Sequence, residues 1–267
     1  MGADVLSKFR RRGAADLADA ALSRGGDRLL GVRTGDFVSL DDVGDNAPNR
    51  IWHAPSDWVQ TWVALRRAGA TPEDVLLDYG CGKGRALVVA RMLPFRRLYG
   101  VDVSPALVEV ARANLRRRSP LMRTPEFEVV VADAAAWDVP DDVTVVFGYC
   151  PFTGPVFAGA IDRLLASVDR RPRRVRFVYS NPFEHNFLLR TGRFRPIDVI
   201  RGQFVPRQRE RRVIVTYEIV APGVPAAAGP RGRIGPWSEE VDRAVSLPAG
   251  FETASAPHAS TRGAVRS

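Results

Sequence analysis

The sequence of 267 residues contains few of the residues from which metal sites and disulfide frameworks are built. It has two cysteines, Cys81 and Cys150, and three histidines, His53, His185 and His258. Two cysteines without a CxxC spacing do not make a disulfide framework, and the histidines lie far apart in the sequence. We therefore expect neither a zinc site nor any other bound metal.

Long apolar runs are also missing. No apolar stretch approaches the roughly 20 residues that a membrane-spanning helix needs. Residues 1–12 include basic side chains with no apolar stretch behind them, so they do not resemble a signal peptide. These absences predict a cytoplasmic protein with no membrane partner. Hydrophobic residues make up 45% of the chain, which predicts a folded core rather than a disordered polypeptide.

Lysine is nearly absent: Lys8 and Lys83 stand alone, and arginine supplies most of the positive charge behind the formal net charge of +9. Basic clusters occur at residues 116–118, 170–176 and 207–212. Such clusters are typical of solvated helix ends and loops, and the alternative is an anionic partner such as nucleic acid or a phosphorylated substrate. Because no aromatic residues interleave them, nucleic acid is a possible partner but not the favoured one.

Short apolar segments alternate with helical patterns through the middle of the chain. Strands are expected at residues 75–79, 98–102, 127–131, 143–147 and 175–179, and helices at 85–93, 104–118, 156–168 and 183–189. This alternation predicts parallel βαβ units. Two further apolar segments, 199–205 and 213–220, have no helix between them and predict a closing β-hairpin. Ser104 and Pro105 have the residue types that favour an N-cap and a first helical position.

The chain divides into three regions by composition. Residues 1–70 are expected to form an N-terminal leader and helical cap, with helices near 14–23 and 55–68. Residues 71–221 carry the alternating pattern of the main domain. Residues 222–267 are rich in Ala, Gly, Pro and Ser, which predicts a mostly disordered tail.

A glycine-rich turn follows the first expected strand. Asp78 and Tyr79 lead into Gly80-Cys81-Gly82-Lys83-Gly84, and a helix begins behind them. Glycine allows a sharp turn with positive φ and lets the backbone approach a ligand, and the amides of the helix N-terminus face that ligand. A nicotinamide dinucleotide site would need its third glycine at position 85, where Arg85 stands. The P-loop pattern fails too, because Lys83 is not followed by Ser or Thr.

Acidic residues follow the next two strands. Asp102 stands 20 residues after Gly82 (102 − 82), where dinucleotide folds place the acid that binds the ribose hydroxyls. Asp133 follows the third strand and is a candidate acceptor for the adenine amino group. The alternative is that each is an ordinary strand-end or turn residue. The candidate cofactor-binding residues are Asp78, Gly80, Cys81, Gly82, Gly84, Asp102, Val103, Asp133 and Ala134.

On these residues the chain resembles the class I S-adenosylmethionine (SAM)-dependent methyltransferases, and among them a largely uncharacterised bacterial family. The similar segments are 78–85, 94–105, 111–115 and the leader segment 31–35. The resemblance implies an α/β, Rossmann-like fold with a seven-stranded, mostly parallel sheet whose last strand is antiparallel. It also implies SAM as the cofactor, and it implies no particular substrate.

The acceptor side departs from that resemblance. Tyr149-Cys150-Pro151-Phe152 stands where the resemblance implies an Asn-Pro-Pro-Tyr type of sequence, whose carbonyl oxygen orients an amine. A thiol is a poor hydrogen-bond acceptor, so Cys150 argues against nitrogen methylation by that mechanism. Asn181, after the fifth strand, is a candidate in its place. The candidate catalytic residues are Tyr149, Cys150 and Asn181, with a buried filler for Cys150 and a plain turn for Asn181 as alternatives.

We therefore predict transfer of a methyl group from SAM to an unidentified acceptor, with a small molecule favoured. The acceptor is expected between Trp52-His53, residues 149–152 and residues 181–183. The alternatives are a protein or nucleic-acid methyltransferase and a catalytically inactive SAM-binding or interaction module. A nicotinamide-dependent oxidoreductase is disfavoured by Arg85.

Overall fold

The computed structural model describes residues 24–35, 55–201 and 213–225. Several sequence predictions fall outside these ranges. They are the helix near residues 14–23, the Trp52-His53 segment, the basic segment 207–212 and the tail beyond residue 225. No helix in the described ranges combines the length and the apolarity that crossing a bilayer requires.

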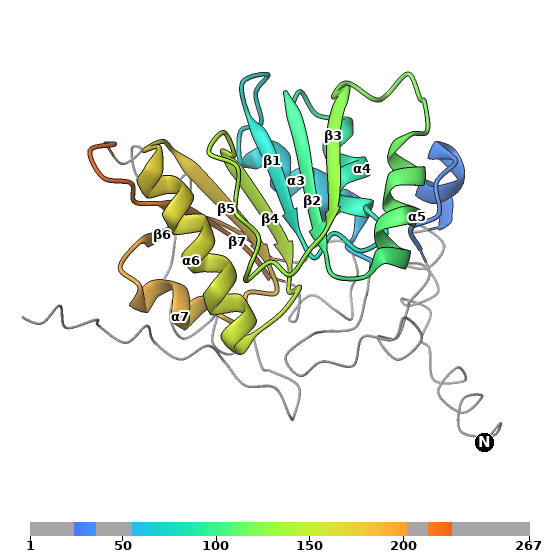
Figure 1. Cartoon of the computed structure of the whole chain (residues 1–267). Helices are drawn as coiled ribbons and strands as arrows, with labels where there is room; N and C mark the ends of the chain where they lie inside the picture. Colours follow the sequence, from blue (N-terminus) through green and yellow to red (C-terminus); the bar gives the residue numbers. More distant parts are fainter. Residues whose placement is uncertain (1–23, 36–54, 202–212, 226–267) are drawn as a thin grey trace, which may run out of the picture.

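A seven-stranded sheet forms the centre of the molecule (Figure 1). Its strands are β1 (Val75–Tyr79), β2 (Arg97–Asp102), β3 (Glu126–Val131), β4 (Val145–Tyr149), β5 (Val175–Ser180), β6 (Phe194–Arg201) and β7 (Val213–Ile219). The strand order is β3-β2-β1-β4-β5-β7-β6. Strands β1 to β5 pair in parallel, whereas β7 runs antiparallel to both β5 and β6. The predicted fold class, with its closing hairpin, is confirmed.

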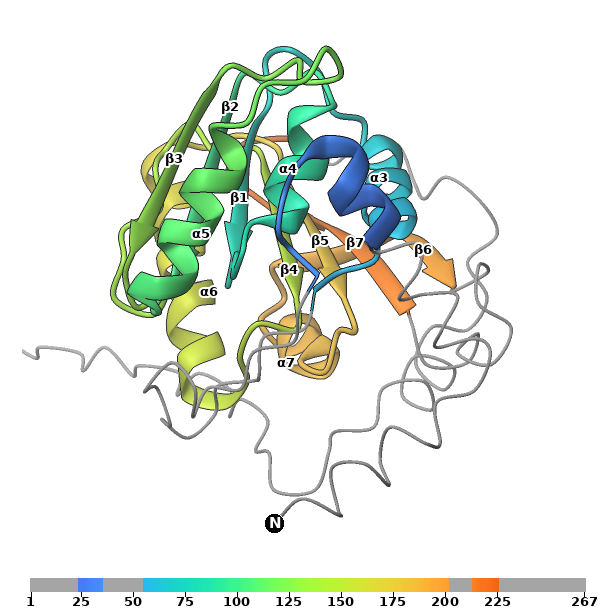
Figure 2. The ribbon, with the colours of Figure 1, turned by 90° about the vertical axis from the view of Figure 1, so that its right-hand side faces the viewer.

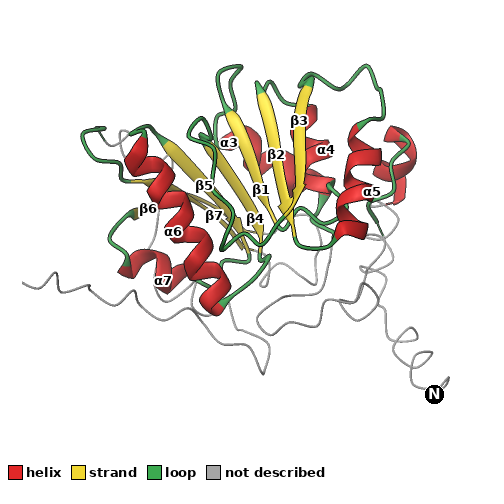
Figure 3. Ribbon diagram, in the orientation of Figure 1, coloured by secondary structure: helices red, strands yellow, loops and turns green. Residues whose placement is uncertain are grey.

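Helices cover both faces of the sheet (Figure 3). They are α3 (Trp58–Arg67), α4 (Arg85–Arg91), α5 (Pro105–Leu115), α6 (Gly154–Arg170) and α7 (His185–Arg190). Leu65, Leu87 and Leu115 bring α3, α4 and α5 into one core layer. On the other face, α6 and α7 pack on β1, β4, β5 and β7. This arrangement leaves the ends of the parallel strands open for loops.

The predicted start of α5 is confirmed. The Ser104 hydroxyl accepts a hydrogen bond from the backbone amide of Leu107, and Pro105 occupies the first turn. The first strand also matches its predicted range, because Val75–Tyr79 is buried along its whole length. Residue types near in sequence therefore define the strand before the glycine turn and the helix after Asp102.

Two strand predictions were wrong in position. β4 begins at Val145 rather than at residue 143, since Val143 is buried in the turn before it. β6 covers Phe194–Arg201 rather than 199–205, because Pro196 is tolerated within it. Pro196 lies on the edge strand beside a register shift, the place in a sheet where proline is accepted. Helices α4 and α5 also end earlier than predicted, at Arg91 and Leu115.

The leader segment 24–35 is docked beside α3 and α4 (Figure 2). Arg85, which is 4% exposed, donates to the Thr34 hydroxyl at 2.7 Å and to the carbonyl oxygen of Ser56 at 2.9 Å. Its guanidinium also lies 3.6 Å from the carboxylate of Asp27, and over the ring of Trp58. One buried cation at the start of α4 therefore fixes two separate stretches of the N-terminal region.

Asn114 on α5 provides a second anchor for the leader. Its side chain accepts from the backbone amide of Arg33 at 2.9 Å and donates to the carbonyl oxygen of Arg33 at 3.1 Å. It also donates to the carbonyl oxygen of Lys83, inside the glycine turn, at 2.9 Å. The leader and the glycine turn are thus attached to the same side chain.

Substitution of Arg85 should release the leader. In Arg85→Gln, the buried Thr34 and the partly buried Asp27 lose a charged donor, a change that typically costs about 3–5 kcal/mol in a buried pair. We expect a lower free energy of unfolding in urea and faster proteolysis near residues 24–35. Arg97→Gln is the matched control, because Arg97 pairs with Glu126 at the surface and should cost under about 1 kcal/mol. Equal losses in the two variants would contradict the role of Arg85.

Candidate functional site

The carboxyl edge of the parallel strands brings the predicted site segments together. β1 leads into the glycine turn, β2 ends at Asp102, and β3 leads to Asp133. β4 and β5 deliver Cys150 and Asn181 to the same edge. The strand order changes direction between β1 and β4, and open α/β sheets bind ligands outside the carboxyl ends at such a point.

The backbone of the glycine turn has the conformation that its sequence predicts. Gly80, Gly82 and Gly84 have φ values of 65°, 50° and 80°, all in the left-handed region. Sterics also require glycine at position 80, because a Cβ there would lie 2.4 Å from the Cβ of Pro151 in the loop after β4. The turn that follows β1 therefore contacts the loop that follows β4 without an intervening side chain.

Asp102 is held against the glycine turn. Its carboxylate accepts from the backbone amide of Gly82 at 2.8 Å and from the amide of Ser104 at 3.0 Å. Each carboxylate oxygen can accept more than one hydrogen bond, so these contacts orient the group without exhausting it. Val103 lies between the two anchors and is half-buried. This geometry holds the carboxylate of Asp102 beside the glycine turn.

Asp78 and Cys81 are more buried than Asp102. Asp78 is 3% exposed, and burial, with a smaller contribution from Asp102, raises the pKa of its carboxyl well above the usual value. The side chain of Cys81 packs into the core beside Gly100, and burial raises the pKa of its thiol. Cys81 can therefore offer a ligand its backbone, while its sulfur fills the space over Gly100.

Asp133 forms a turn of its own after β3. Its carboxylate accepts from the amide of Ala135 at 2.9 Å, and its carbonyl oxygen accepts from Trp137 at 2.9 Å. The amide of Ala132 donates to the carbonyl oxygen of Asp102 at 3.0 Å, which places this turn beside the end of β2. Ala134 is buried within the turn. Both predicted acids thus lie along one edge.

The loops after β4 and β5 share an unusual backbone feature. Cys150 and Asn181 have φ values of 42° and 50°, and they are the non-glycine residues with positive φ in the described part of the chain. The amide of Cys150 donates to the carbonyl oxygen of Ser180 at 3.1 Å, which joins the two loops. Strained backbone of this kind gathers at functional sites. Tyr149, at the end of β4, is half-buried beside them.

Glu184 was missed by sequence analysis. It is fully buried, and its carboxylate accepts from the backbone amide of Gly154 at 2.7 Å, at the start of α6. A glutamate three residues after Asn181 resembles any surface acid in a short helix, so no sequence signal separates it from solvent-exposed acids. Only the pairing of β4 with β5 brings it under the loop that contains Cys150.

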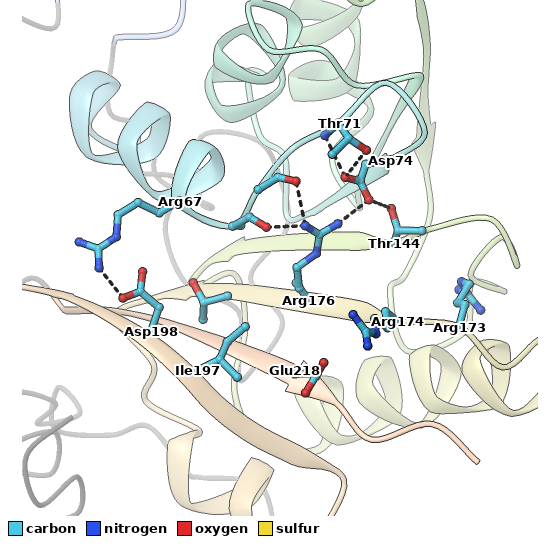
Figure 4. Close-up of a pocket in the computed structure, with 13 residues that line it drawn as sticks. Arg67, Thr71, Asp74, Thr144, Arg173, Arg174, Arg176, Ile197, Asp198 and Glu218 are labelled. Carbon is cyan, nitrogen blue, oxygen red and sulfur yellow. Dashed lines mark hydrogen bonds and ion pairs between the residues drawn. The ribbon is translucent and has the colours of Figure 1, made fainter. Parts of the chain in front are cut away.

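A pocket of about 870 Å³ lies at the opposite, amino edge of the sheet, beneath the end of α3 (Figure 4). Its arginines are used within the chain. Arg176 donates to the carbonyl oxygens of Ala68 and Gly69 and pairs with Asp74, and Arg67 pairs with Asp198 at 2.5 Å. These bonds fix α3 to the sheet. The pocket is separate from the glycine turn.

The arginines of the basic cluster 170–176 also bind groups of the chain itself. Arg170 pairs with Asp141 at 2.8 Å, and Arg173 donates to the carbonyl oxygens of Val143 and Ser167 at 2.6 and 3.0 Å. For this cluster, these bonds favour the interpretation as helix ends and loops over the alternative of an anionic partner.

The buried carboxyl of Asp78 makes stability depend on pH. Because its folded-state pKa is raised, the folded protein binds more protons than the unfolded chain between the unfolded pKa of about 3.9 and the folded value. Stability from this group falls as pH rises through that window. Asp78→Asn should therefore gain stability relative to the parent as the pH rises above about 4, measured by urea unfolding of the ligand-free protein.

Asp141 provides a control, because its pKa is shifted in the opposite direction from that of Asp78. Hydrogen bonding by Arg170 lowers the pKa of Asp141, so its contribution is present above the unfolded pKa and is lost as pH falls. Asp141→Asn should lose stability relative to the parent over the range in which Asp78→Asn gains it. Parallel pH profiles for the two variants would contradict the assignment.

Comparison with known protein families gives a match over the centre of the chain. Residues 76–171 match a family described as a methyltransferase domain. The chain is also similar to the ribosomal protein L11 methyltransferase of Paraburkholderia phytofirmans, with 39% identity over 70 residues, or 23% of each chain. The corresponding protein of Cupriavidus taiwanensis is 45% identical over 47 residues, 18% of this chain and 16% of that one. The chain thus spans under a quarter of the length of these curated relatives.

Solved structures with similar architecture include several methyltransferases. The RNA methyltransferase of Salinibacter ruber, in complex with S-adenosyl-L-homocysteine, has a TM-score of 0.45 and 20% identity, covering 64% of this chain and 97% of that one. The geranyl diphosphate C-methyltransferase of Streptomyces coelicolor has a TM-score of 0.44 and 13% identity, covering 61% and 76%. The matched segment, residues 76–171, lies within the seven-stranded sheet and includes the glycine turn, so this part of the chain is similar to methyltransferase domains.

Proposed function

We propose that the chain transfers a methyl group from SAM to an acceptor that binds between the loops after β4 and β5. The observation that carries the proposal is the glycine turn, in which three left-handed glycines present backbone to a ligand and the Gly82 amide fixes Asp102. Asp102 would hold the ribose hydroxyls, and Asp133 the adenine amino group. Asp78 would lie under the amino acid portion of the cofactor.

Methyl transfer from SAM does not require a reactive side chain. SAM carries an activated sulfonium, so transfer is an in-line displacement that needs alignment and exclusion of water rather than a covalent catalyst. Burial and the nearby Glu184 raise the pKa of the Cys150 thiol, so this sulfur stays protonated and is not offered as a nucleophile. Tyr149 and Asn181 are assigned to the acceptor.

The acceptor class is taken from the site, not from the relatives. The proteins that this chain is similar to are named for a ribosomal protein, for RNA and for geranyl diphosphate. We favour a small molecule, because the aromatic residues Tyr149, Phe152 and Phe183 stand at the ends of β4 and β5, and small-molecule sites combine aromatic side chains with a few polar groups. A protein or nucleic-acid acceptor and an inactive SAM-binding module are the alternatives. The three-part division of the chain and a cytoplasmic location stay predictions.

Binding of SAM should depend on Gly82. In Gly82→Val a β-branched side chain would occupy a left-handed position where backbone meets ligand. We expect calorimetry to show SAM binding to the parent and none to the variant. Gly192→Val is the matched control: Gly192 has a φ of 68°, and a Cβ there meets nothing within 4 Å. It carries similar backbone strain away from the turn and should retain SAM binding.

The role of Asp102 predicts a graded series. Asp102→Ala should weaken SAM binding roughly tenfold to a hundredfold, as loss of a hydrogen bond to a charged group costs about 1.5–3 kcal/mol. Asp102→Asn keeps one oxygen for the amide of Gly82 and should fall between the alanine variant and the parent. An affinity of Asp102→Ala within about twofold of the parent would remove Asp102 from the cofactor site.

A further inference from the structure

The leader segment 24–35 is attached to the glycine turn through one buried side chain. Asn114 on α5 is 5% exposed and lies between the two segments. Its oxygen accepts from the backbone amide of Arg33 at 2.9 Å. Its nitrogen donates to the carbonyl oxygen of Arg33 at 3.1 Å and to that of Lys83 at 2.9 Å. Both N–H groups of this amide are therefore used, one toward the leader and one toward the turn.

The carbonyl of Lys83 lies in the part of the turn that is least determined by its own residues. Lys83 stands between Gly82 and Gly84, whose φ values are 50° and 80°. Glycine has access to many backbone conformations, so the direction of this carbonyl depends on contacts from outside the turn. Asn114 supplies one of them, and Ala111 packs so close that a Cβ on Gly84 would lie 3.1 Å from its own. Contacts from α5 therefore hold the turn in one conformation.

A second set of contacts holds the leader against the start of α4. Thr34 has no exposed surface, and its hydroxyl accepts from Arg85 at 2.7 Å and donates to Asp27 at 2.5 Å. The amide of Thr34 donates to the carboxylate of Asp27 at 2.7 Å. The peptide bond between Arg33 and Thr34 is thus hydrogen-bonded on both sides, its carbonyl to Asn114 and its N–H to Asp27. Undocking would leave buried N–H groups of Asn114 and Arg85 without these acceptors, which is costly.

On the basis of the proposed SAM site, we propose that docking of the leader and binding of the cofactor stabilise each other, with Asn114 as the positioning residue that couples them. The docked leader fixes the side chain of Asn114, and Asn114 fixes the carbonyl of Lys83. A turn that is already ordered loses less conformational freedom when a ligand binds, so its affinity is higher. Because such coupling is reciprocal, the bound cofactor also holds the leader in place. Arg33 and Thr34 need not touch the cofactor for this effect.

Limited proteolysis with trypsin measures the docked state of the leader. The side chain of Arg33 is exposed, but the bond that trypsin cleaves lies between Arg33 and Thr34, and its hydrogen bonds must open first. The rate of cleavage therefore reports how often the leader undocks. We expect saturating S-adenosylhomocysteine to slow cleavage after Arg33 about fivefold or more. Cleavage after Arg118, in the exposed loop that follows α5, is the internal control and should keep its rate.

Thr34→Val loosens the leader without removing a contact of the glycine turn, because it replaces the hydroxyl that binds Arg85 by a methyl group of similar size. We expect faster cleavage after Arg33 and an affinity for S-adenosylhomocysteine, measured by calorimetry, that falls about fivefold or more. Thr34→Ser keeps the hydroxyl and should retain most of the affinity. Thr124→Val is the matched control. It also loses a buried threonine hydroxyl, which donates to the carbonyl oxygen of Leu93, and should leave the affinity unchanged.

Asn114→Asp tests the coupling residue itself. The aspartate keeps an oxygen for the amide of Arg33 but has no N–H for the carbonyl oxygens of Arg33 and Lys83. We expect cleavage after Arg33 to become faster and to lose most of its dependence on S-adenosylhomocysteine. A residue that only stabilised the fold would raise the cleavage rate and leave the protection by the ligand in place. Protection equal to that of the parent would therefore remove Asn114 from the coupling.

The two proposals fail in different ways. If the parent does not bind S-adenosylhomocysteine, the proposed function is refuted. If the parent binds it without protection of the bond between Arg33 and Thr34, the coupling alone is refuted. Faster cleavage in Thr34→Val with an affinity for S-adenosylhomocysteine within about twofold of the parent would refute the coupling as well.

Discussion

The contact between Gly80 and Pro151 is the constraint on which the site depends. A Cβ on Gly80 would overlap Pro151, so the two loops meet backbone to ring. This contact joins the segment that we propose for the cofactor to the segment that we propose for the acceptor, across the point where the strand order reverses. Transfer of a methyl group requires donor and acceptor to be aligned closely, and misplacement by an ångström is costly. A spacing fixed by direct van der Waals contact satisfies that requirement.

Around this contact, buried polar side chains attach peripheral segments to the sheet. Arg85 and Asn114 bind backbone and side chains of the leader, and Glu184 binds the first amide of α6. At the opposite edge of the sheet, Arg176 donates to the carbonyl oxygen of Gly69 and so attaches the end of α3. In each case one side chain spans segments that are far apart in sequence, and its loss would leave buried partners unsatisfied. The charges of this arginine-rich chain therefore serve its own architecture in many places.

Sequence patterns predicted the features that depend on local chemistry. The strand before the glycine turn, the cap at Ser104 and the positive φ of Gly80, Gly82 and Gly84 follow from residue type and spacing. Features that depend on pairing between distant segments were not accessible. Glu184 has no local signature, and the start of β6 was obscured by Pro196, which is acceptable only because β6 lies at the edge of the sheet. The roles of Tyr149, Cys150 and Asn181 stay predictions.

The position of β7 has a consequence for how the chain is made. β7 is the last of the described strands in sequence, yet it lies between β5 and β6 rather than at an edge. While a ribosome synthesises the chain from its N-terminus, β5 and β6 exist before the strand that separates them. Until β7 emerges, β5 presents an open edge, and the aromatic side chains of Phe177 and Tyr179 lack their respective neighbours Tyr217 and Val215. Exposed edges and uncovered aromatic residues favour aggregation, so the nascent chain passes through its most vulnerable state just before the sheet is completed.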